Sequence, residues 1–389
     1  MTIEFAQRIL DLPPYLFAHI DALKNEAIAS GADVIDLGVG TPDLPTPAPI
    51  IEALAEAARD PATHQYPPYN GTAAFREAAA AYYQRRFGVT LDPATEVLAL
   101  IGSKEGIGHL PIAFVDPGDL VLVPNPGYPV YADTTRFCGG EVEYVPLTRD
   151  NGFLPDLDAI PAASARRAKM MWLCYPNNPT GAVAPLAFYE RAVAWAKAND
   201  VVLLSDAAYA DMYFDEDNPP PSILEVDGAK DCAIEFYSLS KTFNMTGWRI
   251  AFAAGNAKLV AGVGKAKTHF DSGCFEAVQR AGIAALALDS GVVRDLRAVY
   301  RQRREVLCGG LAAAGLDVVT PAATFYCMVA NPAGQTSMEF AALLLAEAHI
   351  VATPCNGFGD AGEGFVRMTL CAPAERLAEA AARVAKLAM

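Results

Sequence analysis

The sequence predicts an α/β protein built on a mostly parallel, seven-stranded sheet with helices on both faces, the doubly wound arrangement. Two observations carry this prediction. Short apolar runs without polar alternation recur along the chain, as expected for strands that are buried on both faces, and helical patterns separate several of them. The expected strands are residues 97–101, 121–124, 142–146, 170–174, 201–205, 234–238 and 250–254.

Helices are expected where apolar residues recur at helical spacing. One covers residues 186–198 and starts directly after a proline, and the pair Thr46-Pro47 predicts a capped helix that enters the sheet domain. An amphipathic closing helix is expected over residues 375–389, with apolar positions at Leu377, Ala381, Val384 and Leu387.

The length of 389 residues allows a large core, and one compact unit of two lobes is expected. We expect a large domain over residues 46–285 and a smaller α+β domain over residues 286–389. Residues 1–45 should form an N-terminal arm that belongs to the smaller domain. No internal repeat or low-complexity linker separates these parts.

Composition and charge exclude several classes of partner. A net charge of −15 argues against nucleic acid and anionic membranes, and no apolar stretch has membrane-spanning length. The first residues lack a signal-peptide core, because Glu4, Arg8 and Asp11 interrupt their apolar residues. The eight cysteines form no Cys-x-x-Cys pair, so we expect buried free thiols and no metal site. A cytoplasmic, soluble protein is expected.

The run Ser238-Leu239-Ser240-Lys241, followed by Arg249, predicts a site for an aldehyde cofactor that carries a phosphate. A lysine amine attacks a carbonyl only when it is unprotonated, which requires a partly desolvated, cation-rich setting. The two serine hydroxyls and the guanidinium would then bind the phosphate. This run resembles the cofactor-lysine segment of the fold-type I aminotransferases, which hold pyridoxal 5'-phosphate (PLP) as a Schiff base.

Four further motifs resemble that family in order and spacing. Asp206 and Tyr209 follow an apolar strand; in the family this carboxylate keeps the pyridine nitrogen protonated, and the tyrosine contacts the phenolic oxygen. Asn178 resembles the asparagine that contacts the same oxygen. Ser103 opens a helix whose N–H groups suit a phosphate. Arg367, inside an apolar strand, resembles the arginine that binds the substrate α-carboxylate. Taken singly, these motifs also suit a turn, a helix cap and a structural ion pair.

The resemblance implies the rest of the site. Tyr128 matches the aromatic ring that stacks on the pyridine, although an ordinary core tyrosine remains an alternative. Gly40 matches the backbone that closes over the substrate. Tyr66 matches the tyrosine that reaches the neighbour's phosphate in a homodimer. Lys241 would be both anchor and base for the α-proton, in a ping-pong exchange between an amino acid and a 2-oxo acid.

Within the family, four segments look most like the prokaryotic LL-diaminopimelate aminotransferases, namely residues 12–17, 102–107, 272–273 and 353–359. Those enzymes use a substrate whose distal end carries an ammonium and a carboxylate. Tyr15 and Lys104 match positions near that end, and Lys104 is also expected near the cofactor phosphate. Tyr69 departs from the pattern, because plant-type members have a glutamate there.

Other functions remain open on the sequence. Relatives with similar segments use alanine, aspartate or aromatic amino acids, and the same fold and lysine serve carbon–sulfur lyases. A transcription regulator with an aminotransferase-like domain would need an additional basic helix-turn-helix module, and the chain has no room for one before residue 30.

Overall fold

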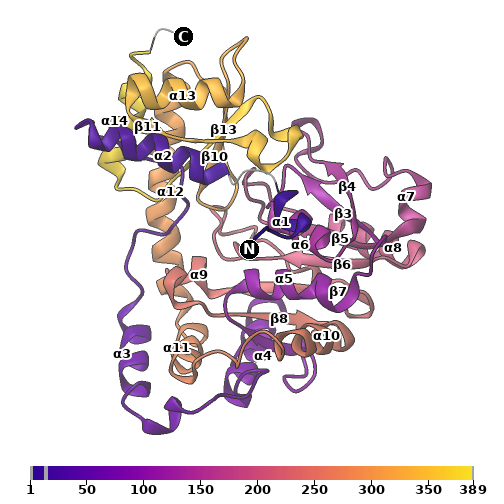
Figure 1. The fold of residues 1–389 in the computed structure, drawn as a ribbon. Coiled ribbons are helices and arrows are strands. Elements are labelled where there is room, and N and C mark those ends of the chain that lie inside the picture. The colour runs from indigo at the N-terminus through magenta and orange to yellow at the C-terminus, as the bar shows by residue number, and fades with distance from the viewer. Residues whose placement is uncertain (1–2, 13–15, 388–389) are drawn as a thin grey trace.

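A seven-stranded sheet forms the middle of the larger lobe in the computed structural model, which describes residues 3–12 and 16–387 (Figure 1). The strand order is β2-β8-β7-β6-β5-β3-β4, and all neighbours are parallel except β8, which is antiparallel to β2 and β7. The predicted fold is confirmed, and each predicted run matches a strand to within two residues at either end. The strands are β2 (Val97–Leu100), β3 (Leu120–Asn125), β4 (Glu141–Pro146), β5 (Ala168–Cys174), β6 (Val202–Asp206), β7 (Ala233–Ser238) and β8 (Ala251–Gly255).

Helices cover both faces of this sheet, because alternate strand residues face two separate apolar clusters. Leu98 and Leu100 pack with helices on one face, and Val97 and Ala99 pack with helices on the other. The first face carries α5 (Ser103–Phe114), α6 (Val130–Phe137) and α10 (Ala257–Lys267), and the second carries α4 (Ala73–Phe87), α8 (Leu186–Asn199) and α11 (Glu276–Leu286). None of the helices in the described part of the chain has the length and apolar character to cross a lipid bilayer.

The smaller lobe contains a four-stranded antiparallel sheet in the order β12-β13-β10-β9 and a two-stranded parallel pair of β1 and β11. The pairing of β1 with β11 joins the N-terminal segment to the C-terminal third of the chain. Its strands are β1 (Ile35–Asp36), β9 (Val318–Val319), β10 (Tyr326–Ala330), β11 (Ile350–Val351), β12 (Thr353–Pro354) and β13 (Phe365–Thr369). One apolar cluster joins residues of β1, β10, β11 and β13 with the helices beside them. The predicted domain boundaries stay predictions.

Helix α12 (Ser290–Ala313) begins beside the larger lobe and ends in the smaller one (Figure 1). The other helices are α1 (Gln7–Leu10), α2 (Leu16–Ala29), α3 (Ala48–Ala57), α7 (Ala162–Arg167), α9 (Leu239–Thr242), α13 (Ser337–Ala348) and α14 (Ala374–Val384). Short 3₁₀ turns are η1 (Pro61–His64), η2 (Arg149–Asn151), η3 (Ile223–Glu225), η4 (Ala229–Asp231), η5 (Thr246–Trp248), η6 (Cys355–Phe358) and η7 (Asp360–Gly362).

Two helix ends differ from the sequence-based expectation. Helix α3 has no side-chain cap, because the hydroxyl of Thr46 donates to the Asn244 carbonyl at 2.7 Å instead, and Pro47 occupies the cap position. The closing helix α14 ends at Val384, since the N–H groups of Lys386 and Leu387 donate three residues back and tighten the last turn. Its predicted apolar face is buried as expected over 377–384.

Candidate active site

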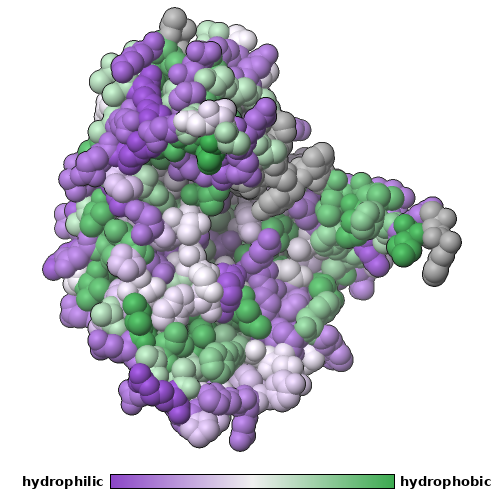
Figure 2. All heavy atoms as spheres, turned by 60° about the vertical axis from the view of Figure 1, so that its left-hand side comes forward, coloured by the Kyte–Doolittle hydropathy of each residue, from purple (hydrophilic) through white to green (hydrophobic). Residues whose placement is uncertain are grey.

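A cavity of about 480 Å³ lies where the parallel strands end, at the edge at which open α/β sheets bind ligands. Loops that follow β2, β3, β5, β6 and β7 line it from the larger lobe, and residues of β10, β13 and the segment after β1 line it from the smaller one. Figure 2 shows the surface hollowed between the upper and lower parts of the molecule. The predicted site residues among its lining are Gly40, Ser103, Lys104, Tyr128, Asn178, Asp206, Tyr209, Ser238, Ser240, Lys241, Arg249 and Arg367.

Lys241 lies on the short helix α9, directly after the end of β7, and its side chain enters this cavity. Its Nζ donates to the carbonyl of Gly40 at 3.2 Å. Burial, together with the guanidinium groups of Arg367 and Arg249, lowers the pKa of Lys241 from 10.5 to about 8. The amine is therefore far more available as a nucleophile or base near neutral pH than an exposed lysine would be.

Asp206 ends β6 and is buried. The hydroxyl of Tyr131 donates to its Oδ2 at 2.6 Å, and the N–H of Ala208 donates to its Oδ1 at 3.2 Å. Tyr131 is held in place by stacking on Trp172, with ring centres 4.5 Å apart. Burial raises the pKa of Asp206, and no salt bridge reaches it within the described ranges. A cationic ring nitrogen in the cavity would supply the missing positive charge.

A second group of residues gathers at the start of helix α5. Gly102 has a φ of +78°, and a Cβ there would lie 2.0 Å from Nη2 of Arg249, so only glycine allows this guanidinium to approach. Ser103 begins the helix, whose first N–H groups have no partners within the helix. The buried Ser238 and Ser240 also line this cavity. Two hydroxyls, a guanidinium and a helix N-terminus together suit a phosphate group.

Arg367 is buried on β13 between two aromatic rings. Its Nη1 donates to Oδ1 of Asn178 at 2.7 Å, and its Nη2 donates to the carbonyl of Gly38 at 2.8 Å. Its Nε is buried without a hydrogen-bond partner, and no carboxylate in the described part of the chain forms an ion pair with it. A buried guanidinium with only neutral partners is suited to bind a carboxylate from outside the protein.

Tyr209 lies beside these groups, and burial raises its pKa. Its hydroxyl donates to that of Tyr326, at 3.3 Å. Tyr326 also packs closely on the segment after β1, since a Cβ on Gly40 would lie 1.8 Å from the Tyr326 oxygen. The two phenols therefore join the loop after β6 to the smaller lobe at the cavity wall.

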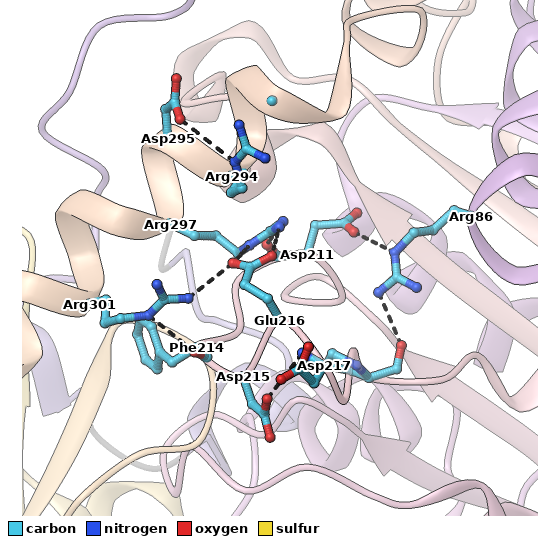
Figure 3. A network of polar contacts seen from close by, with 12 residues as sticks. Arg86, Asp211, Phe214, Asp215, Glu216, Asp217, Arg294, Asp295, Arg297 and Arg301 are labelled. Carbon is cyan, nitrogen blue, oxygen red and sulfur yellow. Dashed lines mark hydrogen bonds and ion pairs between the residues drawn. The ribbon is translucent and has the colours of Figure 1, made fainter.

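The loop that follows β6 is anchored from two sides (Figure 3). On the larger lobe, Nε of Arg86 donates to Asp211 at 2.9 Å. On the smaller lobe, Arg297 of α12 binds both carboxylate oxygens of Glu216, at 2.9 and 2.5 Å, and Arg301 donates to Glu216 at 3.1 Å. These contacts hold the loop that carries Tyr209.

Tyr66 and Tyr69 are not among the residues that line the cavity, and they are 88% and 48% exposed. Tyr15 lies outside the described residues. Sequence reasoning missed several lining residues: Tyr131, Cys174, Thr246, Tyr326 and Phe358. Tyr131 lies three residues after Tyr128, at the start of α6, and the two rings meet edge to face with centres 5.6 Å apart. Thr246 lies within the run around Lys241. Phe358 lies within the segment 353–359 that already resembles the family, whereas Cys174 and Tyr326 are single residues in apolar runs with no pattern of their own.

Comparisons with known proteins agree with this geometry. The family model described as aminotransferase class I and II matches residues 32–384. The chain is 56% identical over 384 residues to an LL-diaminopimelate aminotransferase of Nitratidesulfovibrio vulgaris and 55% identical to one of Aquifex aeolicus, with 99% of each chain covered. The apo-BacF structure from Bacillus subtilis superposes with a TM-score of 0.96 and 40% identity, covering 100% of this chain and 99% of that one. The chain belongs to the class I and II aminotransferases, which are PLP-dependent enzymes.

Proposed function

We propose that this enzyme transfers an amino group between LL-diaminopimelate and 2-oxoglutarate. The observation that carries the choice of substrate is the identity of 56% over the full length to an enzyme of that name. Identity at this level over 99% of both chains supports the same substrate class more strongly than the fold does, because one fold serves many amino acids.

The described residues fit PLP, and we propose their roles accordingly. Ser103, Ser238, Ser240 and Arg249 would hold its phosphate, and Lys104, exposed at the cavity edge, adds positive charge nearby. At the other end of the cofactor, Asp206 would pair with the ring nitrogen, Tyr128 would stack on the ring, and Asn178 and Tyr209 would contact the phenolic oxygen. When bound, PLP supplies an electron sink for negative charge at the substrate α-carbon.

The remaining chemistry belongs to the protein. The neutral amine of Lys241 would take the α-proton of the substrate, and a pKa of about 8 suits a base that works near neutral pH. Arg367 would bind the α-carboxylate. Its hydrogen bonds to Asn178 and Gly38 use two of the five guanidinium N–H groups, which leaves three for the substrate. A planar guanidinium can pair with both carboxylate oxygens at once.

The distal end of LL-diaminopimelate carries an ammonium and a carboxylate, so the enzyme needs partners of both kinds there. Lys104 lines the cavity and would pair with the distal carboxylate. Tyr15 is proposed to contact the same end. Tyr69, where plant-type relatives carry a glutamate, would offer its hydroxyl in place of a carboxylate.

We propose that the active form is a homodimer. The exposed Tyr66 would then reach the phosphate in the partner's cavity. The N-terminal segment supports this proposal, because it projects from the body of the molecule with an apolar surface that a second chain could cover (Figure 2). Ile3, Phe5 and Phe270 are 90%, 75% and 62% exposed, which is unusual for side chains that stay in water.

The reaction type is tested by mixing purified enzyme with LL-diaminopimelate in the presence and absence of 2-oxoglutarate. We expect glutamate to appear only when both substrates are present, with no release of ammonia. LL-diaminopimelate has no group that an elimination could release, so the lyase alternative is tested with cystathionine, an amino acid that has carbon–sulfur bonds. Ammonia and a keto product from cystathionine without any 2-oxo acid would favour the lyase alternative. Strong activity with alanine or aspartate, and none with LL-diaminopimelate, would contradict the proposed substrate and keep the aminotransferase.

A further inference from the structure

The segment of residues 38–43 forms one wall of the cavity and is held by few contacts. Val39, Gly40 and Thr41 line the cavity. At one end, the hydroxyl of Thr353 donates to the Gly38 carbonyl at 2.9 Å. At the other end, the anchor is the side chain of Asp43. The residues between these two anchors belong to neither a helix nor a strand.

The backbone carbonyls of this segment contact the two cationic groups that the proposed function uses. Gly38 accepts from Nη2 of Arg367 at 2.8 Å, and Gly40 accepts from Nζ of Lys241 at 3.2 Å. Gly40 also accepts from the Tyr326 hydroxyl at 3.5 Å. The orientation of both cations therefore depends on where the segment lies.

Asp43 is bound by a buried arginine that lies 260 residues later in the chain. Arg303 of α12 donates to Oδ1 of Asp43 at 2.6 Å and to Oδ2 at 2.8 Å, which is a two-point contact. Its Nη1 also donates to the Leu370 carbonyl at 3.3 Å, just beyond the strand that carries Arg367. Arg303 is 5% exposed, so loss of its partner would leave a buried charge uncompensated.

The same helix also holds the loop that follows β6. Arg297, six residues earlier on α12, binds Glu216 in the loop after Asp206 and Tyr209 (Figure 3). Helix α12 thus holds two segments that contribute residues to the cavity, one through Glu216 and one through Asp43. The contact between Arg303 and Asp43 therefore fixes the end of the segment that contacts Arg367 and Lys241, which is more than a contact for stability alone requires.

We propose that Asp43 and Arg303 are positioning residues, which hold residues 38–42 over the bound substrate so that Arg367 and Lys241 meet its carboxylate and α-proton. This role rests on the proposed aminotransferase function. Neither side chain lines the cavity, and the phosphate-binding residues lie on other segments. Breaking the pair should therefore weaken substrate binding while cofactor binding is retained.

The test compares Asp43→Asn and Arg303→Lys with the wild-type enzyme, using the amino acid that the wild type uses best. Misplacement of the segment should raise KM for the amino acid and the 2-oxo acid by about tenfold or more, with unchanged cofactor absorption. In the double variant the KM values should rise about as much as in one single variant, since each substitution breaks the same interaction. Amide hydrogen exchange over residues 38–42 should become faster in each variant.

The matched control is Asp317→Asn, which breaks an exposed two-point pair with Arg149 at 2.6 and 2.9 Å. We expect it to leave both KM and the exchange of residues 38–42 unchanged. Folded variants whose KM values stay within about twofold of wild type would overturn the positioning role, as would effects that simply multiply in the double variant. If Asp43→Asn does not fold, the KM values of Arg303→Lys decide the question, because this variant keeps the positive charge beside Asp43 and loses only the two-point contact. A wild type that transaminates no amino acid would instead overturn the proposed function.

Discussion

The cofactor-free enzyme should gain stability between about pH 8 and about pH 10.5 through Lys241, because burial lowers the pKa of this lysine from 10.5 to about 8. Above pH 8 the folded protein has released the Lys241 proton, whereas the unfolded chain keeps it until about pH 10.5. The unfolded state then binds more protons, so the free energy of unfolding rises with pH in this window. Below pH 8 both states are protonated, and the folded state bears the full cost of a buried ammonium.

The size of this effect follows from the shift. A difference of about 2.5 pKa units at about 1.36 kcal/mol per unit corresponds to about 3 kcal/mol. Lys241→Met removes the titrating group and keeps a side chain of similar length. Relative to this variant, the wild type should therefore be less stable by about 3 kcal/mol at pH 7, and the deficit should disappear by about pH 10.5.

Urea unfolding of the two cofactor-free proteins at equal concentration, followed from pH 7 to pH 10.5, measures the difference directly. Other titrating groups contribute to both proteins and cancel in the comparison. A difference that stays constant across this range would show that Lys241 titrates as an ordinary lysine, and it would remove the physical basis for its role as a base near neutral pH.

Three further outcomes are expected. Asp206→Asn should leave the circular dichroism spectrum intact but reduce kcat strongly, since an amide cannot hold the proton on the ring nitrogen. A near-normal kcat in this variant would make Asp206 a structural carboxylate. Tyr209→Phe should reduce kcat less. Arg367→Lys should raise KM for every amino acid and 2-oxo acid by about tenfold or more, because a point charge cannot reproduce two parallel hydrogen bonds, and unchanged KM values would argue against the carboxylate site. Borohydride reduction followed by peptide mapping should locate the cofactor on Lys241, and label on another lysine would refute the assignment.

Much of the fold was predictable because the signals are local. Runs such as 121–124 and 170–174 are apolar without alternation, and both become central strands buried on two faces. The cavity residues that follow these strands were predictable for the same reason, since the carboxyl ends of parallel strands share one edge. The Thr46-Pro47 pair misled the prediction of a cap, because the Thr46 hydroxyl binds a carbonyl far along the chain instead.

The remainder of the site depends on contacts that no local pattern records. Asp43 and Arg303 are separated by 260 positions, and each looks like an ordinary surface charge in the sequence. Tyr326 stands alone in an apolar strand and becomes part of the cavity only when β10 packs beside the segment that carries Gly40. Tyr66 is predicted to contact the cofactor phosphate of a partner subunit, and the structure of one chain does not test that contact.

The ratio of kcat/KM values across a substrate panel tests the central claim most directly. With 2-oxoglutarate as acceptor, LL-diaminopimelate should exceed meso-diaminopimelate, alanine, aspartate and phenylalanine. A site built to pair a distal ammonium and carboxylate loses about 1–3 kcal/mol for each polar group left without its partner, which is roughly five- to 150-fold in rate. A higher kcat/KM for alanine or aspartate than for LL-diaminopimelate would contradict the proposed substrate.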